Sequence, residues 1–145
     1  MRAYRDLKAW QHAIDLAPEV YKLVRRLPKE ENFALSNQIR RAVVSIAANI
    51  AEGQSKQNKK EFIQFLFIAK GSLAELETLL ILAEKLSYLQ PADLEQIEPR
   101  IRELRMTLLR TNQSSATRRE RRLASCQFGR LPVLSCLSCL LSDKS

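Results

Sequence analysis

The chain alternates long stretches of helical periodicity with short polar breaks. Across residues 4–27, apolar side chains recur at steps of three and four, the spacing of one face of an α-helix. Pro18 lies inside this pattern and predicts a kink, while Pro28 predicts the helix end, because the residue before a proline avoids helical geometry. The core face expected for this helix consists of Leu7, Trp10, Ile14, Ala17, Tyr21, Val24 and Leu27.

A second helix is expected from residue 33 or 34 to Glu52. Gly53 is placed to end it, since glycine adopts the left-handed conformation of a helix C-terminus without steric cost. The side chains expected in the core repeat at the same helical spacing and are Leu35, Ile39, Val43, Ile46 and Ile50.

The third expected helix is long, from about Lys59 to Leu86, with Asn58 as its cap and Glu61 at capping-box spacing. One apolar stripe runs along it through Phe62, Phe65, Leu66, Ala69, Leu73, Leu76, Leu80 and Ala83. Further apolar residues lie beyond that stripe, namely Ile63, Phe67, Ile68, Leu79, Ile81 and Leu82. A helix that is apolar on more than one face must bury each apolar face against a different partner. We expect these to be its own bundle and a second subunit.

A fourth helix is expected from Pro91 to about Thr111, bent near Pro99. Four helices with short connections predict an all-α protein, an antiparallel up-down-up-down four-helix bundle over residues 1–112. The length of 145 residues, with only three glycines and 6% aromatic residues, agrees with one helical domain. Residues 113–145 are polar, then basic, then rich in Ser, Leu and Cys, so we expect a disordered extension or a shifted reading frame.

The net charge of +8 favours polyanionic partners, either nucleic acid or an acidic membrane surface. Half of this charge falls in residues 113–145, so the bundle itself is mildly basic. The charged N-terminus does not resemble a signal peptide. The longest low-charge run, Leu131–Leu141, is shorter than the roughly 20 residues that a membrane helix needs. We therefore expect a cytoplasmic protein that does not span a membrane.

One polar stripe interrupts the apolar pattern of the second helix. Ser45, Asn49 and Glu52 follow one another at i, i+4 and i+7, a spacing normally filled by core residues. Ser72 and Glu75 on the third helix are their expected partners, beside Gly71, which would let a neighbouring backbone approach closely. We expect an interhelical hydrogen-bond network that fixes the register of the helices. The alternative is a binding pocket lined by the two glutamates.

Signals for catalysis and metal binding are weak. A di-metal carboxylate centre needs Glu-x-x-His pairs on two helices, and the chain has a single histidine, His12, with no acid three positions before it. There is no glycine-rich phosphate loop. Cys136 and Cys139 have zinc-like spacing, but only Cys126 remains as a further cysteine ligand. We expect no enzymatic activity, no metal and no cofactor.

Basic residues recur along the predicted helices and are the candidates for contact with phosphates. In a monomer these basic residues are expected simply to face solvent. Repeated around a symmetric assembly, their charges would add up to a strong positive field. The candidates are Arg25, Arg26, Arg40, Arg41, Lys59, Lys60, Arg102 and Arg105.

Several motifs resemble the family of four-helix proteins encoded in intervening sequences of bacterial 23S rRNA genes. They are Leu7-x-x-Trp10-x-x-Ala13, Leu27-Pro28-x-Glu30, Gln38-Ile39-Arg40-Arg41-Ala42-x-x-Ser45-Ile46-x-x-Asn49-Ile50-Ala51-Glu52-Gly53, Ile68-Ala69-Lys70-Gly71-Ser72-x-x-Glu75 and Leu86-Ser87-Tyr88-Leu89. The resemblance covers about residues 4–111. It implies a four-helix protomer that assembles into a ring-shaped homopentamer. The family is similar to the accessory variability protein of diversity-generating retroelements, which binds nucleic acid and associates with a reverse transcriptase.

Two functions follow as expectations. The first is a non-enzymatic oligomeric bundle that binds RNA or DNA through phosphate contacts with low sequence specificity. The second is a protein-interaction scaffold, an accessory subunit of a reverse transcriptase.

Overall fold

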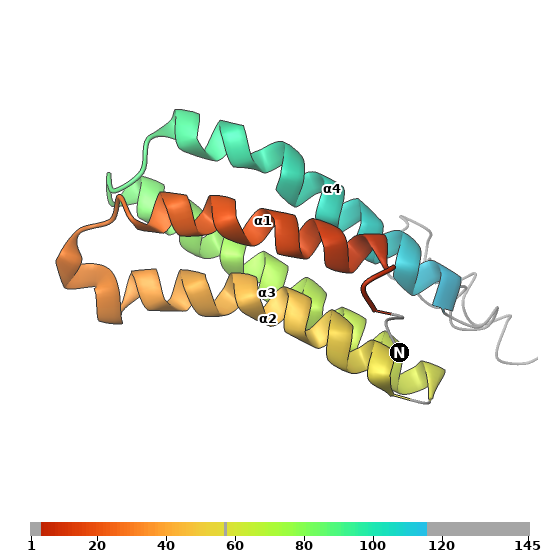
Figure 1. The fold of residues 1–145 in the computed structure, drawn as a ribbon. Coiled ribbons are helices and arrows are strands. Elements are labelled where there is room, and N and C mark those ends of the chain that lie inside the picture. Colours follow the sequence, from red (N-terminus) through yellow and green to blue (C-terminus); the bar gives the residue numbers. More distant parts are fainter. Residues whose placement is uncertain (1–3, 57, 116–145) are drawn as a thin grey trace, which may run out of the picture. The chain divides into compact units, whose positions relative to one another are not determined.

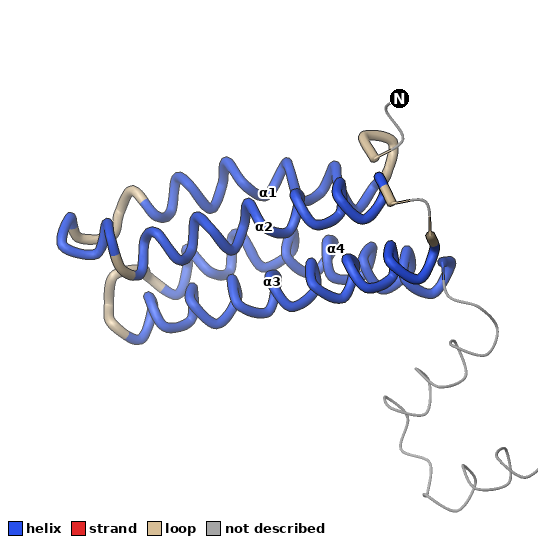
Figure 2. Tube along the Cα trace, turned by 90° about the horizontal axis from the view of Figure 1, so that it is seen from below, coloured by secondary structure: helices blue, strands red, loops and turns tan. Residues whose placement is uncertain are grey.

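Four α-helices form the part of the chain that the structure, a computed structural model, describes: residues 4–56 and 58–115. They are α1 (Lys8–Val24), α2 (Leu35–Ser55), α3 (Lys59–Lys85) and α4 (Pro91–Ser115), with a short 3₁₀ helix, η1 (Lys29–Phe33), between the first two. Successive helices run in opposite directions and lie side by side (Figures 1 and 2). Contacts join α1 to α2, α2 to α3, α3 to α4 and α4 back to α1. The expected all-α four-helix fold is confirmed.

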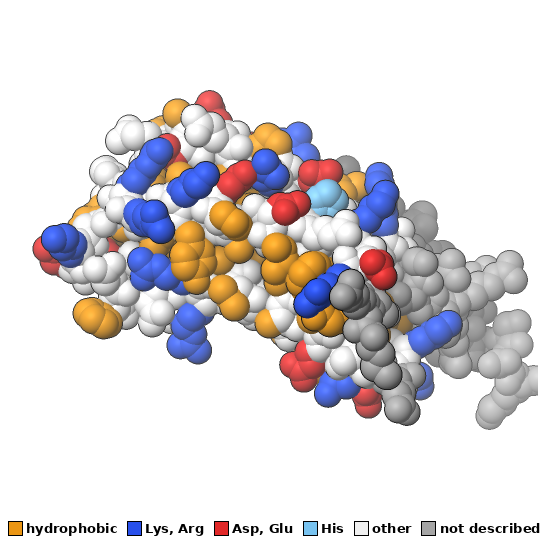
Figure 3. All heavy atoms as spheres, in the orientation of Figure 1, with side chains coloured by type: hydrophobic (Ala, Val, Ile, Leu, Met, Phe, Trp, Pro, Cys, Tyr) orange, Lys and Arg blue, Asp and Glu red, His pale blue; other side chains and the backbone are white. Residues whose placement is uncertain are grey.

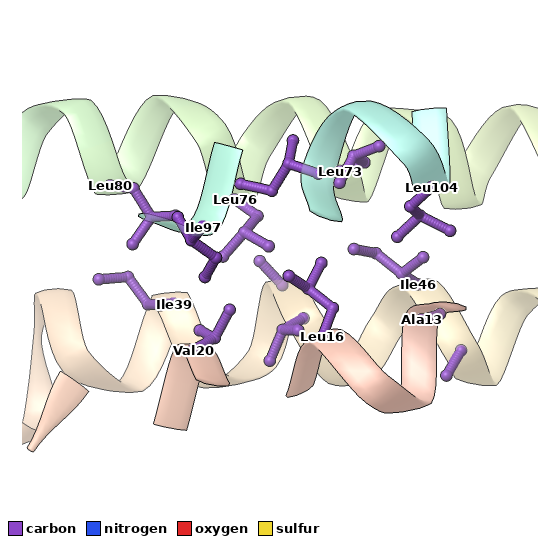
Figure 4. Close-up of a cluster of buried hydrophobic side chains, with 14 of the residues drawn as sticks. Ala13, Leu16, Val20, Ile39, Ile46, Leu73, Leu76, Leu80, Ile97 and Leu104 are labelled. Carbon is purple, nitrogen blue, oxygen red and sulfur yellow. The ribbon is translucent and has the colours of Figure 1, made fainter. Parts of the chain in front are cut away.

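The core lies along the axis between the four helices (Figure 4). Side chains from all four helices point toward one another there, including Leu16 and Val20 of α1, Ile46 of α2 and Leu104 of α4. The five core residues expected for the second helix are buried, each at most 8% exposed. Within the third helix the expected stripe is buried from Leu66 to Ala83, while Phe62 and Phe65 at its start are half-buried.

The buried face of α1 differs from the expected one. Ile14 is 42% exposed and Tyr21 is 38% exposed, and Leu7, Trp10 and Ala17 are only half-buried. Val24 and Leu27 of the expected face are buried, and the other residues that face the core are Ala9, Ala13, Leu16, Val20 and Leu23. The helix also continues through Pro18, from Lys8 to Val24. Most of the stripe with the large side chains thus lies beside the core, where it forms apolar surface.

The expected role of Gly53 as a helix terminator is wrong. The second helix continues to Ser55, and no glycine among the described residues has a positive φ. Gly53 is buried where α2 meets the first turns of α3: a Cβ at this position would lie 2.6 Å from Cβ of Phe65 and 3.1 Å from the ring of Phe62. Its missing side chain makes room for the aromatic residues.

The ends of α3 are fixed by local hydrogen bonds. At the N-terminus the Asn58 side chain accepts a bond from the Lys60 backbone N–H (2.9 Å), as expected for a cap. At the C-terminus Ser87 adopts a positive φ of 62°. The N–H groups of Ser87 and Tyr88 then donate to the carbonyls of Glu84 (2.8 Å) and Ala83 (2.9 Å), the Schellman pattern that turns the chain towards α4.

The last helix extends to Ser115, past the boundary expected after Asn112. The expectation of a disordered extension for the rest of the tail lies outside the described residues. No described helix is both long enough and apolar enough to cross a membrane.

Candidate nucleic-acid interface

Four of the candidate arginines lie at the end of the bundle where α1 connects to α2. Arg25 and Arg26 directly follow the last residue of α1, and Arg40 and Arg41 lie in the second turn of α2. Blue side chains are seen around this end of the molecule (Figure 3). Arg25, Arg26 and Arg41 are exposed and Arg40 is half-buried.

Three of the candidate cations already have a carboxylate partner. Arg26 pairs with Asp93, Arg105 pairs with Glu77, and Arg102 lies 2.6 Å from Glu98 one turn earlier in α4. Arg102 and Arg105 lie on α4, away from the α1–α2 connection. Because each of these charges is neutralised within the protomer, it contributes less to the attraction of a polyanion.

Asp93, the partner of Arg26, is buried at the start of α4. The Gln90 backbone N–H donates to its Oδ2 (3.1 Å), the reciprocal half of a capping box. That hydrogen bond, together with the adjacent Arg26 guanidinium, outweighs desolvation and lowers the pKa of the Asp93 carboxyl below its ordinary value. Arg26 therefore stabilises the contact between the end of α1 and the start of α4, and it is less available to bind an external phosphate.

The remaining candidates divide between the two ends of the bundle. Lys59 and Lys60 are exposed at the start of α3, which lies at the far end of α2 from Arg40 and Arg41. A helix of 21 residues is about 30 Å long, so these lysines are separate from the arginine end. Within residues 4–56 and 58–115, no ion pair is formed by Arg25, Arg40, Arg41, Lys59 or Lys60.

The polar stripe brings three of its five expected members together between α2 and α3. Asn49 Nδ2 donates to Ser45 Oγ (2.9 Å) and to the Ser45 carbonyl (2.7 Å), and Ser45 Oγ lies 2.9 Å from Ser72 Oγ. Ser72 Oγ donates its single hydrogen to the Ile68 carbonyl (3.1 Å). Ser45 must then be the donor to Ser72, and one directed chain runs from Asn49 through both hydroxyls to Ile68.

The two glutamates expected in this network lie elsewhere. Glu52 is exposed, and its carboxylate pairs with Lys56 at 3.5 Å. Glu75 is exposed, and Gly71 has nothing within 4 Å of the position that a Cβ would occupy, so no backbone approaches it within the protomer. The glutamate-lined pocket is therefore not formed. What remains is a network whose hydroxyls satisfy one another, which favours a structural role for it.

The single histidine lies on the seam between α1 and α4. His12 Nε2 is 3.7 Å from Glu103, and Arg100 pairs with Glu19 at 2.6 Å further along the same seam. Among the described residues no three His, Cys, Asp or Glu side chains are grouped closely enough to hold a metal ion.

Sequence reasoning missed an open groove on the outer surface of α1. Its volume is about 490 Å³, and it is lined by Ile14, Ala17, Pro18, Tyr21, Lys22 and Arg25. The residues were visible in the sequence, but the stripe of Ile14, Ala17 and Tyr21 was assigned to the core. No signal in the sequence separates this stripe from the core stripe, because the buried residues Leu23 and Val24 lie just as close to Lys22 and Arg25.

Comparison with known proteins decides the family. A family model described as 23S rRNA-intervening sequence protein matches residues 5–110. The chain belongs to this family. Among solved structures, it is similar to a protein with unknown function from the S23 ribosomal protein family of Bacteroides thetaiotaomicron: 28% of residues are identical, the TM-score is 0.66, and the match covers 72% of this chain and 97% of that one. No curated protein matches the chain.

Proposed function

We propose that this member of the 23S rRNA-intervening sequence protein family is a non-enzymatic homo-oligomer that binds RNA or DNA through phosphate contacts, with little sequence specificity. The observation that carries the proposal is a set of three arginines at the α1–α2 end that form no ion pair within the described residues: Arg25, Arg40 and Arg41. Clustered cations attract the phosphate backbone irrespective of base sequence. Repetition of the cluster around an assembly would extend the positive surface.

The arginine cluster is tested by replacing two exposed members, Arg25→Gln and Arg41→Gln, in the full-length chain. We expect the double variant to bind a fluorescein-labelled oligonucleotide about tenfold or more weakly at roughly 50 mM salt, because two phosphate contacts are lost. The slope of log affinity against log salt should become shallower by roughly 1.4 to 1.8. Fluorescence anisotropy over a salt series measures both quantities.

A matched control carries Arg102→Gln and Arg105→Gln, which remove the same charge from ion-paired positions. Residues 113–145, with their own charge of +4, are present in both variants, so the difference between the variants reports on the bundle. Equal losses in both would contradict the assignment to the α1–α2 end. Absence of binding by the unchanged protein at about 50 mM salt would overturn nucleic-acid binding altogether.

Self-association is supported by the outer surface of α3. Phe67, Ile68, Ile81 and Leu82 are each 44–51% exposed there. Exposed apolar patches of this kind mark interaction sites. Gly71 lies between the two pairs with open space above it, which leaves room for a partner's side chain.

Light scattering on the purified full-length chain should therefore give several times the 16.7 kDa mass of one protomer. Phe67→Asp combined with Ile81→Asp should shift the mass towards one protomer, because charges would have to be buried in the contact. Met106→Asp, at an exposed apolar position on α4 (46%), should leave the assembly unchanged. A monomer at every protein concentration would contradict self-association and favour the alternative of a scaffold for another protein, such as a reverse transcriptase.

A further inference from the structure

The groove on α1 combines an aromatic ring with an apolar floor on the protein surface. Tyr21 is 38% exposed, and Ile14, Ala17 and Pro18 line the same groove. Apolar side chains gather on this face of the molecule, over α1 and the neighbouring edge of α2 (Figure 3). Ala17 and Pro18, about one turn before Tyr21, contribute only small side chains to the lining. A flat ligand of about the size of one nucleobase has room to lie against that ring.

Two cations edge this apolar surface. Lys22 and Arg25 line the groove, are exposed, and form no ion pair within the described residues. They are three positions apart in sequence, which places them about one helical turn from each other along α1. Both have long side chains that reach beyond the groove.

A third cation belongs to α2. Ser45 marks the α3-facing side of α2, because it bonds Ser72. Arg40 precedes Ser45 by five residues, about 140° around the helix, which places it on the side that faces α1. Its half-buried side chain lies within two turns of the α1–α2 connection, as does Tyr21. Lys22 and Arg25 line the groove, and Arg40 of the neighbouring helix therefore adds positive charge at the same end of the bundle.

We propose that this groove binds an unpaired nucleobase stacked on Tyr21, while Lys22 and Arg25 contact the phosphates on either side of it. The ligand class is single-stranded RNA or DNA. In a duplex the base faces are covered by their neighbours, so only the phosphate contacts would be available. The inference rests on the proposed nucleic-acid binding and adds to it a place on the protein and a preference for single strands.

A second copy of this chain is the competing occupant of the groove. Charge argues against a two-fold contact through this face, since it would bring Lys22 and Arg25 of one protomer against the same cations of its partner, and in a ring the face would have to meet a different surface of the neighbour. The outer surface of α3 offers larger side chains for that purpose, Phe67, Ile68, Ile81 and Leu82. A polyanion with exposed aromatic bases is complementary to the groove in both charge and shape.

The test compares Tyr21→Ala with Tyr21→Trp in the full-length chain. The matched control is Phe33→Ala, which removes an aromatic ring that is 95% exposed on η1 and lies outside the groove. Three labelled probes of equal length are used: a single-stranded DNA, its duplex, and a single strand with abasic sites that keep every phosphate. Affinities come from fluorescence anisotropy, and oligomer mass from light scattering.

We expect Tyr21→Ala to weaken binding of the single strand about fivefold or more, because one base–aromatic stack is lost. Binding of the duplex and of the abasic strand should change less than about twofold, since the phosphate contacts persist. Tyr21→Trp should retain the affinity for the single strand, and Phe33→Ala should match the unchanged protein with all three probes.

Other outcomes overturn the inference in distinguishable ways. If Tyr21→Ala binds the single strand normally, or weakens all three probes equally, no base stacks on Tyr21, and phosphate binding still stands. If Tyr21→Ala lowers the oligomer mass, the groove is a contact between copies. If the unchanged protein binds none of the probes, the proposed function itself fails.

Discussion

Replacing Leu16 with alanine is expected to lower the free energy of unfolding by about 2–5 kcal/mol, the range for large-to-small changes in a packed core. Leu16 is fully buried and points into the centre of the bundle, towards side chains from the other helices (Figure 4). Truncation removes apolar burial and leaves a cavity that rigid helices fill only partly.

Ile14→Ala is the matched control, two positions away on the same helix. Because Ile14 is 42% exposed, its truncation should cost about 1 kcal/mol or less. Urea unfolding followed by circular dichroism, at several protein concentrations, measures both variants and separates folding from assembly. If Ile14→Ala proves as costly as Leu16→Ala at every concentration, the face assigned to the core is wrong.

This pair of residues also shows how far the sequence determines the fold. The helices and their antiparallel order follow from periodicity and short connections, and the core positions of α2 follow from one uninterrupted apolar stripe. For α1 two stripes compete, one with the larger side chains (Trp10, Ile14, Tyr21) and one containing two alanines. A hydrophobicity pattern favours the larger side chains. It carries no information on whether an apolar stripe faces its own bundle or something outside the protomer.

The polar stripe on α2 likewise could be predicted only in part from the sequence pattern, because its partners depend on how the helices pack. Short side chains such as Ser45 and Ser72 can bond only where two helices come close, so their spacing predicted a contact that the structure contains. Glu52 lies seven residues after Ser45, and seven residues fall about 20° short of two turns. Its longer side chain reaches solvent, where Lys56 is available. Helical spacing therefore predicted the contact between α2 and α3. It did not predict which polar side chains lie within that contact.

The cations were found by composition, yet their availability depends on tertiary contacts. Arg105 meets Glu77 across 28 positions of sequence and Arg26 meets Asp93 across 67. No local pattern predicts such pairs. The candidates that remain available for phosphate binding lie at the α1–α2 end of the bundle or at the start of α3, and the two groups are separated by most of the length of α2.

Gly53→Ala is expected to destabilise the protein, although alanine is the better helix former. The added Cβ would lie 2.6 Å from Cβ of Phe65, an atom fixed to the backbone of α3, so the two helices would have to move apart. Overpacking of this kind costs about 1–3 kcal/mol. The gain in helix propensity returns up to about 1 kcal/mol. We expect a net loss of about 1–2 kcal/mol in the free energy of unfolding.

Gly71→Ala makes the same chemical change in the middle of α3, where nothing lies within 4 Å of the added atom. The propensity gain is then unopposed within the protomer, and at a protein concentration low enough to separate the copies we expect the variant to be more stable by up to about 1 kcal/mol. Denaturant unfolding should therefore move the two variants in opposite directions from the unchanged protein. Equal stabilisation of both would show that α2 and α3 do not approach closely at Gly53. Destabilisation by Gly71→Ala together with a lower oligomer mass would instead place a second protomer against Gly71, because only a neighbour absent from the single protomer can crowd that position.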